Sequence, residues 1–460
     1  MNKINVKLPA RASIWYLGAS ASAKAIGFLL TPFFTRMISG QAYGELTVYL
    51  TLVGIGSVCS SSITSGSAIY MGIRRNEGDE GSFLRSVLLV STLSSLTFCI
   101  VLFAFVPFLA IKRQLIIPLI VQLLCDGIIA VYTARQKYFY RYKTVAMMIT
   151  ASSVLPAILT LLLLKTVNGR FSVRIYSLLA ISICLAIYSL INIHGEKGQI
   201  KRELCVHHLK NAIPLIPHSL SAAISGQGDK LIITHLLGTY ALAKYSVVHS
   251  LGVGLQFAVG AVGFALGPWI IRRLDNRDFR EVSYLSGFLL TAFSALSLIL
   301  VALAPEAMKI LAPKEYLDAF PALLPIALST PLTLLSSILT ICLVHFGRGG
   351  KVALSSILAA ISGILLNFTL VPKLGYLGAG LSLFISHLID SSIGLYLLLK
   401  VIPRKIIGTA EVVKNLLLTS LVGVLIILLF NSPALRVLLL TVPALMLLNV
   451  FYNLKGLILE

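Results

Sequence analysis

The sequence predicts an all-α polytopic membrane protein with about fourteen transmembrane helices. Of its 460 residues, 57% are apolar and only 12% are charged, and the mean hydropathy is +0.93. A soluble protein carries about 25% charged residues, so this composition excludes a soluble globular enzyme and a disordered chain. In addition, apolar runs of about 20 residues, the length that crosses a bilayer, follow one another along the whole sequence.

The apolar runs place the expected helices in chain order. Backbone amides in lipid must bond within their own segment, and no run alternates as a barrel strand does, so we expect each run to be helical. The expected spans are 13–36, 43–70, 84–107, 114–133, 145–164, 171–193, 212–237, 242–267, 284–304, 319–346, 352–371, 376–400, 412–430 and 434–452.

The charges indicate topology. There are 38 lysine and arginine residues against 17 acidic residues, a net charge of +21. In a soluble chain this excess would suggest a nucleic-acid partner, but here the cations gather in short loops between apolar runs, where they set orientation. With a cytoplasmic N-terminus, 25 cations fall in cytoplasmic segments and 10 in outer segments. We therefore expect both termini in the cytoplasm and no nucleic-acid partner.

Motifs of soluble enzymes are missing from the sequence. It has no Gly-rich phosphate loop of the Walker type and no zinc-like spacing of Cys and His, so we predict no cofactor and no metal. The longest predicted loop, 194–211, has eighteen residues. An enzyme that builds or polymerises sugars at a membrane usually needs a larger extramembrane part to hold its site, so the loops favour a transporter over an enzyme.

A weak internal repeat suggests two lobes. The stretch FFTRMISGQAYGELTVYL from Phe33 resembles IITHLLGTYALAKYSVVH from Ile232 without a gap. The offset of 199 residues equals about six helices with their loops. Repeats related by an axis along the membrane normal are a common transporter plan, with the substrate held between the halves. We expect a six-helix N-terminal lobe at 1–195, a six-helix C-terminal lobe at 196–405 and a terminal helix pair at 406–460.

Two stretches resemble a known family. Leu209 to Gly252, LKNAIPLIPHSLSAAISGQGDKLIITHLLGTYALAKYSVVHSLG, resembles the seventh and eighth helices of Wzx-type polysaccharide flippases. These flippases belong to the multidrug/oligosaccharidyl-lipid/polysaccharide exporter superfamily. The stretch LLNFTLVPKLGYLGAGLSL, Leu365 to Leu383, resembles their eleventh and twelfth helices. The sequence departs from the family pattern at Ala243 and Lys244, where a Gly-containing turn is usual.

The resemblance implies a two-lobed, V-shaped transporter in the bacterial inner membrane. Such proteins move an undecaprenyl-pyrophosphate-linked oligosaccharide from the cytoplasmic to the periplasmic leaflet by alternating access. The repeat unit then feeds O-antigen (lipopolysaccharide) or capsule assembly, next to a polysaccharide polymerase and a chain-length regulator. Membrane lipid and an H⁺ or Na⁺ gradient are further expected partners, because no ATP site is visible. Composition and spacing alone predict only a polytopic transporter.

Several ionisable or amide side chains at bilayer depth are candidates for substrate contact. A charge there costs from about 3 kcal/mol upward, so it tends to face a cavity or a partner. Lys24 is expected to line a cavity and attract the pyrophosphate; the alternative is an ion pair with a neighbouring helix. The other candidates are Arg36, Gln227, Asp229, Lys230, Gln256 and Asn367. Their alternatives are snorkelling for Arg36, structural pairing or packing for the adjacent Asp229 and Lys230, and interhelical hydrogen bonding for the amides.

Three residues are candidates for ion coupling. His387 and Asp390 lie three residues apart on one helix face, and a carboxylate beside an imidazole makes a proton-responsive pair. The alternative, which we favour, is that both are satisfied within the core. Asp126, near the middle of the fourth span, has the same two interpretations.

Two other functions compete with the flippase. A drug/cation antiporter of the same superfamily predicts an acidic cavity, whereas the strongest central charge of the first predicted lobe is Lys24. A membrane glycosyltransferase or polymerase predicts acidic catalytic residues on a long external loop, which the predicted topology lacks.

Overall fold

The computed structural model describes residues 7–63, 66–105, 111–164, 171–195, 198–213, 216–401, 408–429 and 432–448. Over these ranges the chain forms helices joined by turns, without a β-strand. By the contacts between its helices, the chain divides into two compact units, Met1–Ala243 and Lys244–Glu460. The three-part division at residues 195 and 405 stays a prediction.

The first unit is built from long apolar helices and two short ones. Its elements are α1 (Lys7–Met37), α2 (Gly40–Ile63), α3 (Gly66–Arg75), α4 (Glu80–Phe105), the 3₁₀ turn η2 (Arg113–Leu115), α5 (Ile116–Tyr138), α6 (Tyr142–Leu164), α7 (Ser172–His194), α8 (Arg202–Ala212) and α9 (Ile216–Leu237).

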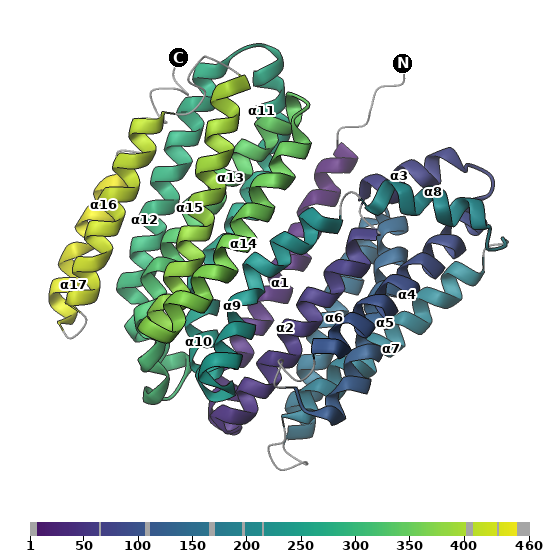
Figure 1. Ribbon diagram of the computed structural model, residues 1–460, viewed down its shortest axis with the longest axis horizontal. Helices are drawn as coiled ribbons and strands as arrows, with labels where there is room; N and C mark the ends of the chain where they lie inside the picture. The colour runs from purple at the N-terminus through teal and green to yellow at the C-terminus, as the bar shows by residue number, and fades with distance from the viewer. Residues whose placement is uncertain are drawn as a thin grey trace. The chain divides into compact units, whose positions relative to one another are not determined.

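Helix α5 lies at the centre of the first unit, because α2, α4 and α7 all pack against it. Around it, α6 packs on α1 and α7, and α9 packs on α2. The short helices α3 and α8 lie together at one end of α4, α5 and α7 (Figure 1). Ile73, Phe83 and Val131 form an apolar core beneath this end.

The second unit contains the remaining helices. After α10 (Thr239–Gly252), which crosses the unit boundary, follow α11 (Gly254–Asp275), α12 (Phe279–Leu311), the 3₁₀ segment η4 (Lys314–Ala322), α13 (Leu323–His345), α14 (Gly349–Leu374), α15 (Tyr376–Val401), α16 (Thr409–Leu428) and α17 (Pro433–Leu439).

Helix α13 is the core helix of the second unit, with α11, α12 and α15 packed around it. Pro331 lies inside this helix, and proline lacks the N–H that would bond the carbonyl four residues earlier. That carbonyl, on Ala327, instead accepts a hydrogen bond of 3.0 Å from Ser297 Oγ of α12. Helix α16 packs along α12, and α17 packs against α16 (Figure 1).

Each predicted span contains helical residues where the structure describes it, but several boundaries differ. The last residues of spans 84–107, 412–430 and 434–452, and residues 214–215 of span 212–237, lie outside the described residues. Span 43–70 covers residues of α2 and α3, with residues 64–65 outside the described ranges, and span 242–267 is interrupted between Gly252 and Gly254. Span 319–346 begins with 3₁₀ turns in η4 instead of α-helix. Within the described residues, nine helical segments are long and apolar enough to cross a membrane. The chain is therefore a multi-pass membrane protein by length and composition, while the count of fourteen stays a prediction.

The turn between α9 and α10 lies at Gly238, before Ala243 and Lys244, where the family pattern usually has a Gly-containing turn. Gly238 has φ +89°, a left-handed conformation that favours glycine, and it joins α9 to α10. Ala243 and Lys244 lie inside α10, so this chain turns before these two residues.

Candidate functional site

Two lysines and an amide lie together in the first unit. Lys24 is exposed on α1, and Lys230 is half-buried on α9. The Lys230 ammonium donates a hydrogen bond of 2.8 Å to Gln227 Oε1, one turn earlier on α9. Lys24 and Lys230 are close enough for their charges to repel each other. No described carboxylate forms an ion pair with Lys24, whereas Lys230 is also attracted by the adjacent Asp229.

Asp229 and Arg36 differ in their surroundings. Asp229 is 4% exposed, and its Oδ1 accepts a hydrogen bond of 2.8 Å from the Lys230 backbone N–H. Arg36 is exposed in the last turn of α1, where its Nη1 donates to the Pro32 carbonyl at 3.3 Å. A cation at a helix C-terminus also interacts favourably with the helix dipole. Substrate contact by Asp229 or Arg36 stays a prediction.

The two candidate amides of the second unit make structural hydrogen bonds. Gln256 Nε2 of α11 donates to Ser329 Oγ of α13 at 3.1 Å. Asn367 is 4% exposed on α14, and its Nδ2 donates to the Gly363 carbonyl at 2.8 Å. The Asn367 Oδ1 atom is buried and has no hydrogen-bond partner among the described residues. Gln256 thus joins two helices, and Asn367 keeps one acceptor for a further donor.

His387 and Asp390 interact through their charges, but Asp390 has a different hydrogen-bond partner. Both side chains are half-buried on α15. The Ser336 hydroxyl of α13 donates to Asp390 Oδ2 at 2.7 Å and lies 3.2 Å from Ser391 Oγ. Ser391 in turn donates to the Leu332 carbonyl at 3.0 Å. The carboxylate therefore belongs to a polar network between α13 and α15.

Asp126 has an amide partner on its own helix. Gln122 Nε2 donates to Asp126 Oδ1 at 2.9 Å and to Ser182 Oγ of α7 at 2.8 Å. We did not single out Gln122 from the sequence, although its position four residues before Asp126 places both on one helix face. Ser182 contributes from another helix, and no sequence signal points to it.

One further ion pair was not predicted from the sequence. Lys244 Nζ of α10 lies 2.5 Å from Asp318 Oδ2 of η4. Lys244 is nearly buried, with 11% of its side chain exposed, so the carboxylate neutralises a cation that would otherwise lie among apolar groups. The residues of this pair are far apart in sequence, and only the packing of η4 against its neighbours brings them together.

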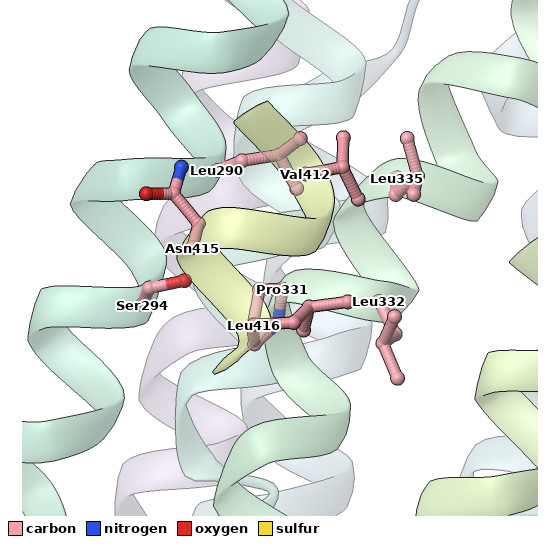
Figure 2. A pocket seen from close by; sticks show the side chains of 8 residues that line it. All are labelled: Leu290, Ser294, Pro331, Leu332, Leu335, Val412, Asn415 and Leu416. Atoms are coloured by element: carbon pink, nitrogen blue, oxygen red, sulfur yellow. The ribbon is translucent and has the colours of Figure 1, made fainter. Parts of the chain in front are cut away.

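None of these candidate residues lines the small pocket of the second unit. The pocket lies between α12, α13 and α16. Figure 2 shows Leu290, Pro331 and Leu416 lining it, with Asn415 and Ser294 as its polar side chains. Asn415 Nδ2 already donates to Thr291 Oγ1 at 2.8 Å, so the pocket is mainly apolar. Among the described residues, no group of three or more His, Cys, Asp or Glu could hold a metal ion.

Comparison with known sequences identifies similar proteins. Residues 10–274 match the family described as polysaccharide biosynthesis protein. The Lsg locus putative protein 1 of Haemophilus influenzae is 21% identical over 386 residues, which cover 80% of this chain and 93% of that protein.

Comparison with solved structures supports the fold. The lipid II flippase MurJ in an inward closed conformation matches with a TM-score of 0.75 and 14% identity, over 95% of this chain and 98% of that chain. An inward-facing multidrug resistance MATE family transporter of the MOP superfamily matches with a TM-score of 0.60 and 14% identity, over 83% and 94%. At such low identity the likeness shows a shared fold, and it confirms the all-α polytopic class.

Proposed function

We propose that this chain, which belongs to the polysaccharide biosynthesis protein family, flips undecaprenyl-pyrophosphate-linked oligosaccharide repeat units across the membrane. Transport runs from the cytoplasmic to the periplasmic leaflet of the bacterial inner membrane by alternating access, for O-antigen or capsule assembly. The family membership, the relative encoded at the Lsg locus and the flippase fold support this proposal. The family membership also agrees with the resemblance to Wzx-type flippases in the sequence.

The pair of Lys24 and Lys230 carries the proposal. The adjacent Asp229 attracts Lys230, but Lys24 repels it, and a bound anion would offset this repulsion at membrane depth. A pyrophosphate offers several acceptor oxygens and at least two negative charges, and an ammonium binds phosphate as a point charge. Gln227, which already contacts Lys230, has an amide N–H₂ that is suited to a sugar hydroxyl.

The remaining parts of the proposal follow the topology. Both termini lie in the cytoplasm, the lobes comprise residues 1–195 and 196–405, and residues 406–460 form a terminal helix pair. An H⁺ or Na⁺ gradient supplies the driving force, with Asp126, His387 and Asp390 as the coupling candidates. A polysaccharide polymerase and a chain-length regulator take the product. Arg36, Asp229, Gln256 and Asn367 are secondary candidates for substrate contact.

The experiment replaces Lys24 by alanine. Flipping of a lipid-linked oligosaccharide in proteoliposomes should fall by about tenfold or more, because a charge-assisted hydrogen bond contributes about 1.5–3 kcal/mol and about 1.4 kcal/mol is tenfold. Lys24→Arg should retain most activity, since it keeps the charge. Lys351→Ala, an exposed cation at the start of α14, serves as the control. In cells, the lipid-linked repeat unit should accumulate in the inner leaflet.

Wild-type surface polysaccharide in a normally inserted Lys24→Ala variant would contradict the role of the lysine pair. The competing function is an ion-coupled drug/cation antiporter, which the fold shared with a MATE transporter favours. Efflux of cationic drugs by the purified protein, together with no flipping of the lipid-linked oligosaccharide, would establish that function instead.

A further inference from the structure

A carboxylate, an amide and two hydroxyls gather at the centre of the first unit. Asp126 lies near the middle of α5, and Gln122 lies one turn earlier with 5% of its surface exposed. Gln122 Nε2 bridges Asp126 Oδ1 and Ser182 Oγ at 2.9 and 2.8 Å. Tyr49 of α2 is 0% exposed, and its hydroxyl lies close enough to Asp126 to interact electrostatically. Three helices thus contribute to one polar cluster.

Two polar atoms of the cluster lack a partner. Gln122 Oε1 and the Tyr49 hydroxyl are buried and make no hydrogen bond with the described residues. Buried polar groups are nearly always paired, because leaving one unpaired costs about 1–3 kcal/mol. The amide oxygen can only accept, so what it lacks is a donated hydrogen.

Asp126 also lacks a counter-ion. Within the described chain its carboxylate accepts one hydrogen bond, from Gln122, and makes no ion pair. A charged carboxylate at this depth is unfavourable without a cation, and intramembrane carboxylates of this kind commonly serve in proton pathways. Asp126 is half-buried on α5.

The neighbouring titratable groups do not replace the missing cation. Tyr49 of α2 and Cys125 of α5 interact electrostatically with Asp126, and neither carries a positive charge in any protonation state. The other titratable groups on the elements packed against α5 make no hydrogen bond or ion pair with Asp126. They are Tyr43 and Glu45 of α2, Tyr70, Arg74 and Arg75 of α3, Glu80, Arg85 and Cys99 of α4, Arg113 of η2, Tyr142 and Lys143 of α6, and Arg174, Tyr176, Cys184, Tyr188 and His194 of α7.

We propose that Asp126 is a proton-binding site and that Gln122 holds the bound proton in a closed acid–amide pair. The proton adds to Asp126 Oδ2 as an O–H bond, and this hydrogen is donated to the unpartnered Gln122 Oε1. Gln122 Nε2 continues to donate to Asp126 Oδ1. On release the O–H bond breaks and the proton returns to water, so the exchange needs no other reactant. This inference rests on the proposed function in one respect: the proton gradient would drive the flipping.

A sodium ion fits the same cluster less well. Both hydrogens of the Gln122 amide nitrogen point at Asp126 Oδ1 and Ser182 Oγ, two of the oxygens that a metal ion would need. A proton satisfies the amide oxygen and neutralises the carboxylate without moving these bonds. Sodium binding is therefore an outcome that the experiments must separate from proton binding.

The first experiment detects the proton without any substrate. Infrared difference spectra of the full-length protein in lipid, recorded between acidic and alkaline buffer, should contain a carboxylic C=O band that Asp126→Asn removes. In Gln122→Leu this band should move to higher frequency, because the acid loses its acceptor. Glu77→Gln, an exposed carboxyl in the turn after α3, is the matched control and should leave the band unchanged. A band that persists in Asp126→Asn would overturn the site, as would a band that sodium alone abolishes at constant pH.

The second experiment tests coupling. In proteoliposomes, a pH gradient should accelerate wild-type flipping of a lipid-linked oligosaccharide, and Asp126→Asn should make the rate independent of the gradient. Unchanged gradient dependence in a folded Asp126→Asn variant would overturn the coupling role. If no lipid-linked oligosaccharide is flipped while the infrared band behaves as described, the proposed function fails and the proton site stands. The two failures are thus distinguishable.

Discussion

At the scale of single residues, charges show how far the sequence predicts the site. Gln227 and Lys230 lie three residues apart, so helix geometry alone predicts that they share a face. The electrostatic interaction of Lys24 with Lys230 depends on the tertiary positions of α1 and α9, and no local pattern encodes it. The same holds for Lys244 and Asp318, whose partnership is set by the position of η4. Sequence predicts which residues need a partner, whereas tertiary packing decides which partner they find.

The polar network around Asp390 leads to a prediction about stability. Ser336→Ala removes the hydroxyl that donates to Asp390 Oδ2, and the half-buried carboxylate then loses its hydrogen bond. We expect the free energy of unfolding to fall by about 1 kcal/mol. Denaturant unfolding in detergent measures the change. The matched control is Ser337→Ala, whose hydroxyl bonds only the Thr333 carbonyl of its own helix. Equal stability of the two variants would contradict the role of Ser336.

At the scale of helices, hydropathy predicted where helices lie but not where they break. An apolar run looks continuous whether or not the backbone turns within it, as between α10 and α11. A signal was present there, because Gly252 and Gly254 flank the break and glycine is a poor helix former. By contrast, Pro331 lies in α13 without ending it, since Ser297 bonds the carbonyl that the proline frees.

The attachment of α17 to α12 depends on one arginine. Arg436 is 4% exposed, and it donates to the Ala302 carbonyl at 2.8 Å and to both carboxylate oxygens of Glu306 at 2.6 and 3.1 Å. Arg436→Ala should destabilise this contact by about 1–2 kcal/mol, a range lowered because Glu306 is half-exposed. Hydrogen exchange of the α17 amides should accelerate in this variant. In Arg436→Lys the exchange rate should lie between those of the wild type and of Arg436→Ala. Unchanged exchange in the alanine variant would show that apolar packing alone holds α17.

Hydrogen bonds hold the segment before α8 to the start of α4. Gln199 N–H donates to Ser82 Oγ at 3.0 Å, and Lys201 N–H donates to Ser86 Oγ at 3.1 Å. The hydrogen bond from the Lys201 ammonium, helped by Ser82, lowers the pKa of Asp79 below its usual value. A carboxyl with a lowered pKa stabilises the fold above its ordinary pKa and loses that contribution as the pH falls through the lowered value.

Acidification should therefore loosen this segment. We expect exchange of the Gln199 and Lys201 amides, corrected for the intrinsic pH dependence, to accelerate below about pH 4, the ordinary range of an aspartate. Asp79→Asn should show the faster exchange already at neutral pH and no further change on acidification. A variant that still responds to acid would assign the effect to another carboxyl.

At the scale of the whole molecule, composition predicted the class and the family resemblance predicted the activity. The low charge content and the apolar runs require a polytopic helical protein, and the described helices agree. Orientation rests on a different signal, the distribution of Lys and Arg over short loops. That signal assigns opposite sides to the two ends of α14, where Arg348 precedes the helix and Lys373 lies in its last turn.

Cysteine accessibility tests this orientation in the full-length chain. Both Arg348 and Lys373 are exposed, so a cysteine at either position can react. In a variant whose native cysteines are replaced, a membrane-impermeant maleimide added to spheroplasts should label Lys373→Cys. Arg348→Cys should be labelled only after permeabilisation, because the loop before α14 is cytoplasmic in the proposed topology. Labelling of Arg348→Cys in intact spheroplasts would show that α14 has the opposite orientation. The proposed topology, and with it the proposed direction of transport, would then be wrong.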